Sequence, residues 1–101
     1  MRINVDVEFL WVPSDLGGHK GPPFSGMRLE IRWQRYLEAF LACAWVVECE
    51  VLTFDEVSLR GRARCVFSPW AKIPAEWLHS GQMIELLNGH KVMAVGKIVG
   101  L

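Results

Sequence analysis

Apolar and polar residues alternate along three stretches in the first half of the chain, with the two-residue period that is typical of a half-buried β-strand. In the second of these stretches, the apolar side chains all fall on one side, while two arginines and a glutamate fall on the other. Three strands are therefore predicted, and they run from Asn4 to Val12, from Met27 to Trp33 and from Cys43 to Val51.

The second half of the chain continues this pattern. Leu59 to Cys65 alternates again, and its polar side carries three arginines. Met83 to Leu87 is an apolar run, and the Asn88-Gly89 dipeptide that follows favours a type I′ turn because both residues tolerate a positive φ. Lys91 to Val99 is then predicted to return as the partner strand. About six short strands without long helical segments indicate an all-β protein, either an antiparallel barrel or a sandwich.

Glycine and proline define the longest connection between the predicted strands. Pro13 to Gly26 contains four glycines and three prolines, a density that is incompatible with a helix interior or a central strand. We expect a long surface loop there and a tight turn near Phe54 to Val57. Gln34 to Ala42 has spacings that suit one or two turns of helix, but periodicity alone does not decide its conformation.

The size and charge of the chain narrow the range of functions. A chain of 101 residues, half of them apolar, predicts a single domain over residues 1–101 with one hydrophobic core. Eleven basic and eleven acidic side chains cancel, which argues against general binding to nucleic acid or to a membrane surface. Met1 to Asp6 has no long apolar run, so we expect no signal peptide, no membrane partner and a cytoplasmic location.

Side chains that could carry chemistry are scattered along the chain. The three cysteines form no C-x-x-C pair and lie among apolar residues, which predicts buried, inert thiols. The three histidines lack the spacing of a metal site, and the glycine-rich loop lacks the G-x-x-x-x-G-K-[ST] phosphate-binding arrangement. We therefore expect no enzyme activity, no cofactor, no metal and no bound nucleotide.

The arginine row on the fourth predicted strand has two interpretations. Together with basic residues elsewhere, the row could present a strip to an RNA backbone or to an acidic protein surface. If Thr53 pairs near Leu59, however, each of two glutamates on the preceding strand faces an arginine, and the row is ordinary cross-strand ion pairing. The pairs expected in that case are Glu50 with Arg62 and Glu48 with Arg64.

Two tryptophans lie between the predicted fourth and fifth strands. Trp70 and Trp77 belong to a loop-like stretch, Ser68 to Ser80, that contains two prolines. Large aromatic side chains in such a position either plug the end of a barrel or bind a partner. We expect a plug, because a core of this size needs large side chains to close it. If the tryptophans are exposed, they become candidates for a binding surface.

Two segments resemble the C-terminal barrel of translation elongation factor Tu. Residues 17–28 read GGHKGPPFSGMR and are similar to the family's GGRxxPFxxGYRPQF loop. Residues 81–87 and 96–99 are similar to the hairpin that ends the family's barrel. The resemblance implies a six-stranded antiparallel β-barrel. Because that barrel contacts tRNA in the family, it also raises the prospect of RNA binding, although Glu30 replaces a family glutamine and would repel phosphate.

The pattern and the resemblance together predict a non-catalytic binding module that makes contact through the glycine-rich loop, residues 16–28. We expect a protein partner, with structured RNA as the alternative ligand. An immunity or inhibitor protein that neutralises a toxin is the second function that fits a small, neutral barrel. The predicted contact residues are Gly17, Gly18, His19, Lys20, Phe24, Arg28, Arg32, Arg60, Arg62 and Arg64.

Overall fold

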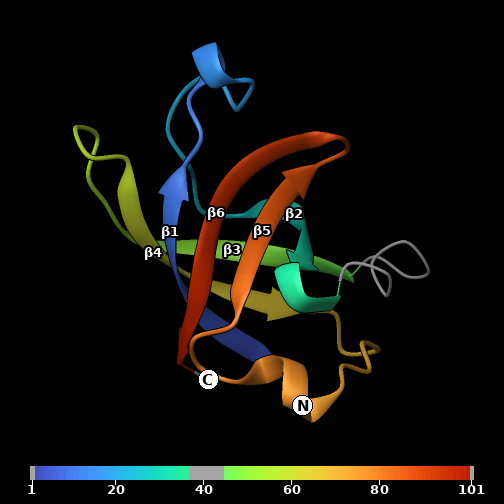
Figure 1. The fold of residues 1–101 in the computed structure, drawn as a ribbon. Helices are drawn as coiled ribbons and strands as arrows, with labels where there is room; N and C mark the ends of the chain where they lie inside the picture. The colour runs from blue at the N-terminus through green and yellow to red at the C-terminus, as the bar shows by residue number, and fades with distance from the viewer. Residues whose placement is uncertain (1, 37–44, 101) are drawn as a thin grey trace.

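The chain folds into a closed, six-stranded antiparallel β-barrel with the strand order β1-β4-β3-β2-β5-β6 (Figure 1). The structure is a computed structural model, and it describes residues 2–36 and 45–100. Short 3₁₀ turns, η1 (Ser14–Leu16), η2 (Gln34–Tyr36) and η3 (Ala75–Leu78), lie between strands. The strands are β1 (Asn4–Trp11), β2 (Met27–Trp33), β3 (Trp45–Phe54), β4 (Arg60–Phe67), β5 (Met83–Asn88) and β6 (Lys91–Gly100).

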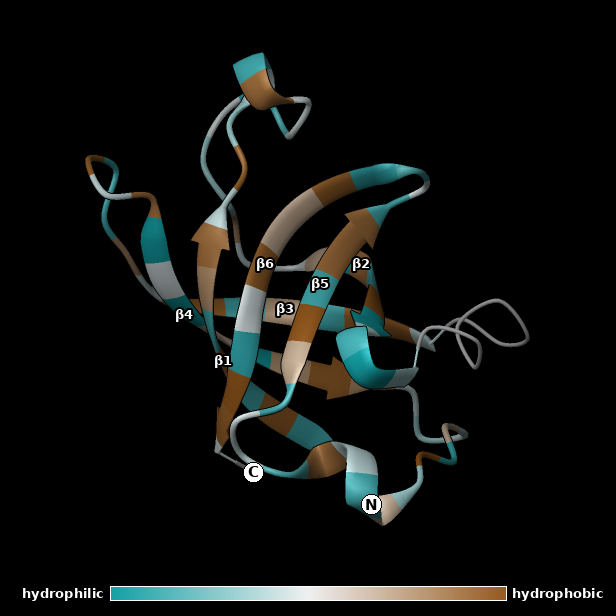
Figure 2. Ribbon diagram, in the orientation of Figure 1, coloured by the Kyte–Doolittle hydropathy of each residue, from teal (hydrophilic) through white to brown (hydrophobic). Residues whose placement is uncertain are grey.

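The predicted all-β class is confirmed, and pairing between the first and last strands decides for a barrel over a sandwich. β1 pairs with β4 on one side and with β6 on the other, so the sheet closes on itself. Figure 2 shows the alternation of hydrophobic and hydrophilic residues along the strands. The hydrophobic side chains of this alternation point inward and form one core, which includes Val5, Val7, Ile31, Val47, Ile84 and Ile98.

The pairing register predicted for the arginine row is wrong by two residues. Glu50 faces Arg64, and Glu48 faces Val66, which carries no charge. A β-bulge between Val51 and Thr53 inserts one extra residue into β3, so that Thr53 faces Arg62. The pair next to the turn, Thr53 with Arg62, already differs by three residues from the predicted pairing of Thr53 near Leu59, and the bulge reduces this shift to two. Neither predicted pair forms, but Glu50 still faces an arginine, Arg64.

The turn between β5 and β6 also differs from the prediction. Asn88 pairs with Lys91, so the two central residues are Gly89 and His90 rather than Asn88 and Gly89. Gly89 has a φ of 63°, and Leu59 is the only non-glycine residue with a positive φ in the described part of the chain. A positive φ at the first central position alone is the requirement of a type II′ turn. The hairpin itself is as predicted, whereas the type I′ geometry is not.

Aromatic side chains fill one end of the barrel, which we call the closed end. Trp77 of η3 packs there against Trp33, Tyr36 and Trp45, with ring centroids 5.2, 4.6 and 5.2 Å away. The indole N–H of Trp33 donates a hydrogen bond to the carbonyl oxygen of Trp77, at 2.7 Å. The predicted plug is confirmed for Trp77, which is 8% exposed, whereas Trp70 is 86% exposed.

The segment that the sequence left unassigned is described only in its first three residues. Gln34–Tyr36 forms η2, a single 3₁₀ turn, while residues 37–42 and Cys43 lie outside the described residues. Within residues 2–36 and 45–100, no helix is long and apolar enough to cross a membrane.

Candidate binding site at the open end of the barrel

The glycine-rich loop between β1 and β2 folds over the other end of the barrel, which we call the open end. After Trp11, the chain forms η1 and turns back at Gly17, whose φ of 92° is a left-handed conformation. The next residue, Gly18, is buried against Val12, and a β-carbon there would lie 1.8 Å from the Val12 carbonyl oxygen. Glycine is therefore required at position 18 by close packing, and it is favoured at position 17 by backbone conformation.

Hydrogen bonds attach the returning half of the loop to the barrel. The indole N–H of Trp11 donates to the Gly21 carbonyl oxygen at 2.9 Å. Farther along, the Gly26 amide donates to the Cys49 carbonyl oxygen at 2.8 Å, and the Val51 amide donates to the Ser25 hydroxyl at 3.0 Å. The loop is thus held at its middle and at its end, which gives it a defined shape before any partner binds.

The turn between β3 and β4 forms the facing wall of the open end. The Asp55 carboxylate accepts hydrogen bonds from the amides of Val57 and Ser58, at 2.8 and 3.2 Å, and these bonds lower the pKa of Asp55. Leu59 ends the turn with a φ of 64°, a conformation that costs a branched residue about 1 to 2 kcal/mol. Its carbonyl oxygen accepts a hydrogen bond from the Trp11 amide at 2.8 Å. Strained backbone of this kind is often found at binding sites.

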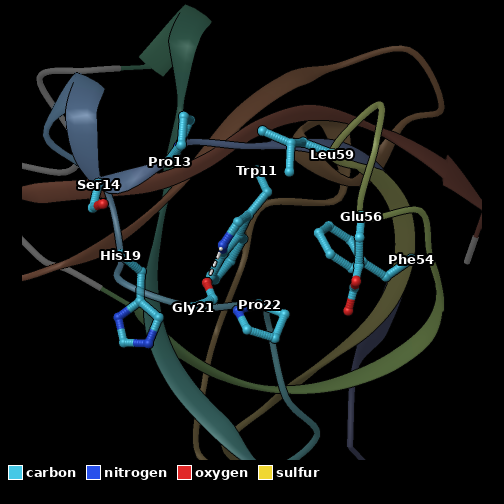
Figure 3. A pocket seen from close by; sticks show the side chains of 9 residues that line it. All are labelled: Trp11, Pro13, Ser14, His19, Gly21, Pro22, Phe54, Glu56 and Leu59. Carbon is cyan, nitrogen blue, oxygen red and sulfur yellow. Dashed lines mark hydrogen bonds between the residues drawn. The ribbon is translucent and has the colours of Figure 1, made fainter.

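A pocket of about 320 Å³ lies between the loop and this turn (Figure 3). Figure 3 shows the Trp11 ring at its centre, with His19 on one side and Phe54 on the other. Most of its wall is aromatic or proline, and Glu56 and His19 are its titratable side chains. A concave apolar site with a few polar groups is the usual form of a recognition pocket. The pocket is lined by Trp11, Pro13, Ser14, His19, Gly21, Pro22, Phe54, Glu56 and Leu59.

Of the loop residues predicted as contacts, His19 alone lines this pocket, and Phe24 lies next to His19. His19 lines it and makes an edge contact with Trp11, with ring centroids 5.9 Å apart. Phe24 is 56% exposed, and its ring centroid lies 6.4 Å from that of His19. Gly17 and Lys20 are exposed, whereas Gly18 is buried against Val12 and is not available for contact. The loop therefore presents the imidazole and phenyl rings together.

The predicted arginines do not join the loop in one basic strip. Arg32 pairs with Glu85 of β5 at 2.9 Å. Arg64 pairs with Asp6 of β1 at the same distance, and Asp6 raises the pKa of Arg64. The hydrogen-bonded acidic partner of Arg64 thus comes from β1, while Glu50 of β3 faces Arg64 and adds a smaller electrostatic attraction.

The remaining arginines lie on the outer surface, with Arg60 and Arg62 on the exposed face of β4 and Arg28 on β2. Arg28 lines a hollow of about 270 Å³ together with Arg2 and Glu48. Arg60 lines another hollow, of about 410 Å³, on the outside of β1, β5 and β6. Arg62 faces Glu8 in the β1 register and Thr53 in the β3 register. The three arginines of the row thus share one face of β4 but differ in their neighbours.

Eight of the nine pocket residues were not among the predicted contacts, and four of these lie outside the loop and its η1 turn. Trp11 carries the parity of a core strand residue, so the sequence offers no sign that its ring also lines a pocket. The other three, Phe54, Glu56 and Leu59, belong to the turn that was predicted near residues 54–57. The charged Glu56 in this turn was the feature of the sequence that could have indicated a contact residue. The sequence does not indicate that this turn contacts a loop some thirty to forty residues away in the chain, because that contact is long-range.

Two of the three cysteines form a buried pair inside the barrel. Cys49 and Cys65 are free thiols whose sulfur atoms lie 3.9 Å apart on β3 and β4. The hydrogen bond with Cys49, and then burial, raise the pKa of Cys65 well above its ordinary value. The prediction of buried thiols is confirmed for these two. Within residues 2–36 and 45–100, no group of histidine, cysteine and carboxylate side chains could hold a metal ion.

Comparisons with protein-family models and with curated proteins find no match to this chain. The geometry of the open end therefore carries the functional interpretation.

Proposed function

We propose that this protein is a non-catalytic binding module, related to the C-terminal barrel of elongation factor Tu, that holds a protein partner at the open end of its barrel. The observation that carries the proposal is the pocket of about 320 Å³ between the glycine-rich loop and the β3–β4 turn. Its walls are mostly apolar, and hydrogen bonds hold the loop in place. Such pre-organisation reduces the ordering cost of binding.

The placement of the basic residues favours a protein over RNA as the partner. An RNA backbone is bound by a continuous set of lysines and arginines that follows the spacing of the phosphates. Here, Arg32 and Arg64 are in ion pairs with Glu85 and Asp6, and Arg28 and Arg60 lie in different hollows. The loop itself contributes an aromatic surface, which is typical of the central contacts in protein interfaces.

An inhibitor or immunity protein is the second candidate, and the loop favours it. Phe24 projects from a loop that is tied to β3 at Ser25 and Gly26. A rigid loop that projects one apolar side chain can fill the pocket of another protein without a large change of shape. The partner in that case would be a toxin, and it would contact the same open end.

Affinity capture from the cell extract tests the proposed surface. The tagged protein, the double variant His19→Ala/Phe24→Ala and the control variant His79→Ala are compared, each with and without nuclease. We expect one protein to be retained by the native chain and by the control, because the exposed His79 follows η3 at the closed end. The double variant should lose it at least about tenfold, since it removes two aromatic contacts.

Two results would contradict the proposal. Loss of the bound material after nuclease treatment would make RNA the ligand. Equal retention by the double variant would place the interface elsewhere on the barrel, for example over the exposed Leu10 and Met83 of the outer hollow.

A further inference from the structure

We propose that the pocket at the open end receives a positively charged side chain, an arginine or a lysine, from the protein partner. The inference rests on the proposed function, because it names the group that the partner would place in this pocket. It follows from the kinds of side chain in the wall, from the charge of the lining and from the size of the space.

The wall of the pocket suits a cation because it presents aromatic rings. The electron-rich face of a tryptophan or phenylalanine ring attracts a guanidinium or ammonium group within about 6 Å of the ring centroid. Trp11 and Phe54 both line the space, and Figure 3 shows their rings on neighbouring parts of the wall. The polar edge of Trp11 is occupied, because its N–H donates to Gly21. Trp11 is 3% exposed, so it offers a small part of its ring to the pocket, and the half-buried Phe54 offers more.

The lining carries one carboxylate, that of Glu56. No ion pair or hydrogen bond of the Glu56 side chain with another described residue is present, so its charge is available to a ligand. None of the described lining residues is a lysine or an arginine, and the basic side chain in the lining is the imidazole of His19. A phosphate or carboxylate in this space would face Glu56 and would be repelled, whereas a cation would gain a charge-assisted hydrogen bond.

Charged residues around the rim balance one another. Asp15 of η1 and Asp55 of the turn are acidic, and Lys20 and Arg60 are basic. Arg60 lines the outer hollow rather than this pocket, and Lys20 is exposed. The charge of the lining residues therefore decides whether the pocket prefers a positively or a negatively charged ligand.

The volume of the pocket fits one side chain. Pockets for drug-sized ligands span roughly 300 to 1,000 Å³, and this one, at about 320 Å³, lies at the small end. The apolar stem of an arginine or lysine would pack against Pro22 and Leu59 while its charged end reaches Glu56, which is the way such side chains lie across apolar surfaces.

A titration with two matched probes tests the inference. N-acetyl-arginine amide carries the charge, and N-acetyl-citrulline amide has nearly the same shape without it. Binding is followed by the NMR signal of the Trp11 indole N–H. We expect the arginine probe to shift this signal saturably, with a dissociation constant at least about tenfold lower than that of the citrulline probe, because only a cation gains from Glu56 and the rings.

Variants separate charge recognition from shape. Glu56→Gln should weaken the arginine probe by up to about fivefold, the effect of losing one exposed charge pair, and should leave the citrulline probe unchanged. Glu76→Gln, which removes an exposed acid of η3 at the closed end, is the matched control and should leave both probes unchanged. Both substitutions are at exposed positions, and the rest of the spectrum reports that the variants are folded.

Three results would overturn the inference. They are equal affinity of the two probes, no shift of the Trp11 signal with either, and a shift of that signal by inorganic phosphate that exceeds the shift by arginine. The partner capture described above distinguishes this failure from failure of the proposed function. Suppose that Glu56→Gln retains the partner as the native chain does, and that only the loop double variant loses it. The proposed interface is then supported, and the proposal of a cationic side chain in the pocket is rejected.

Discussion

The two ends of this barrel are both built around tryptophan, yet one is filled and the other holds a pocket. At the closed end, Trp77 packs on Trp33 and Trp45 with ring centroids 5.2 Å away. At the open end, Trp11 has Phe9 and His19 as its ring neighbours, 6.2 and 5.9 Å away, and about 320 Å³ beside it is unfilled.

The difference comes from the segments that cover the two ends. The closed end is covered by η3, which contributes the large side chain of Trp77 to the space between the strands. The open end is covered by a loop whose backbone turns at Gly17, Gly21 and Gly26, all with a positive φ. Glycine and proline shape a backbone but supply little volume, so the loop forms a wall without filling the space. Covering a barrel end is therefore separable from plugging it.

The largest effect is expected at the closed end. Trp77→Ala should lower the free energy of unfolding by about 3 to 5 kcal/mol, because it removes a buried tryptophan and leaves a cavity among three aromatic rings. Urea unfolding followed by circular dichroism measures this value. A loss of less than about 1 kcal/mol would show that the ring stack does not stabilise the barrel and would remove the distinction between the ends.

An intermediate effect is expected beneath the loop of the open end. Gly18→Ala places a β-carbon against the Val12 carbonyl, and the loop must move to relieve the overlap. We expect a loss of about 1 to 3 kcal/mol, the usual cost of overpacking, and a change in the Trp11 indole NMR signal. Leu16→Ala, at an exposed position of the same loop, is the control and should change stability by less than about 0.5 kcal/mol. Equal effects of the two substitutions would contradict the close packing at Gly18.

The smallest effect on stability is expected for the exposed tryptophan that precedes η3. Trp70→Ala should change the free energy of unfolding by less than about 0.5 kcal/mol, because the side chain is 86% exposed. It should also remove much of the fluorescence that acrylamide quenches readily, since the other four described tryptophans are buried or half-buried. If quenching is unchanged, Trp70 is covered in solution.

The strands were predictable because the alternation of apolar and polar residues along each strand indicates which of its faces is buried. The expected strand at Met27–Trp33 has the bounds that the structure shows, since one face packs on the core and the other faces water. The register of β3 on β4 was not predictable in this way. It depends on a bulge near Leu52 and on the left-handed conformation of Leu59, neither of which changes the alternation of apolar residues.

The candidate site also has a part that was predictable from the sequence and a part that was not. The glycine-rich loop and its His19 and Phe24 were identified from residue types, because glycine and proline density marks a loop and loops often bind. The ion pairs and hollows in which the arginines lie could not be identified from residue types. Arg64, for example, contacts Asp6 only because β1 pairs with β4.

By itself, the sequence determined the strand faces, the all-β class and the positions of the long loop and the final hairpin, since these follow from side-chain periodicity and from the backbone preferences of glycine and proline. Tertiary structure alone decided which strands pair, which tryptophan plugs an end and which is exposed, and the meeting of Trp11, His19, Phe54 and Glu56 in one pocket. The physical reason is that periodicity records whether a residue is buried, whereas closure of the barrel decides what it is buried against.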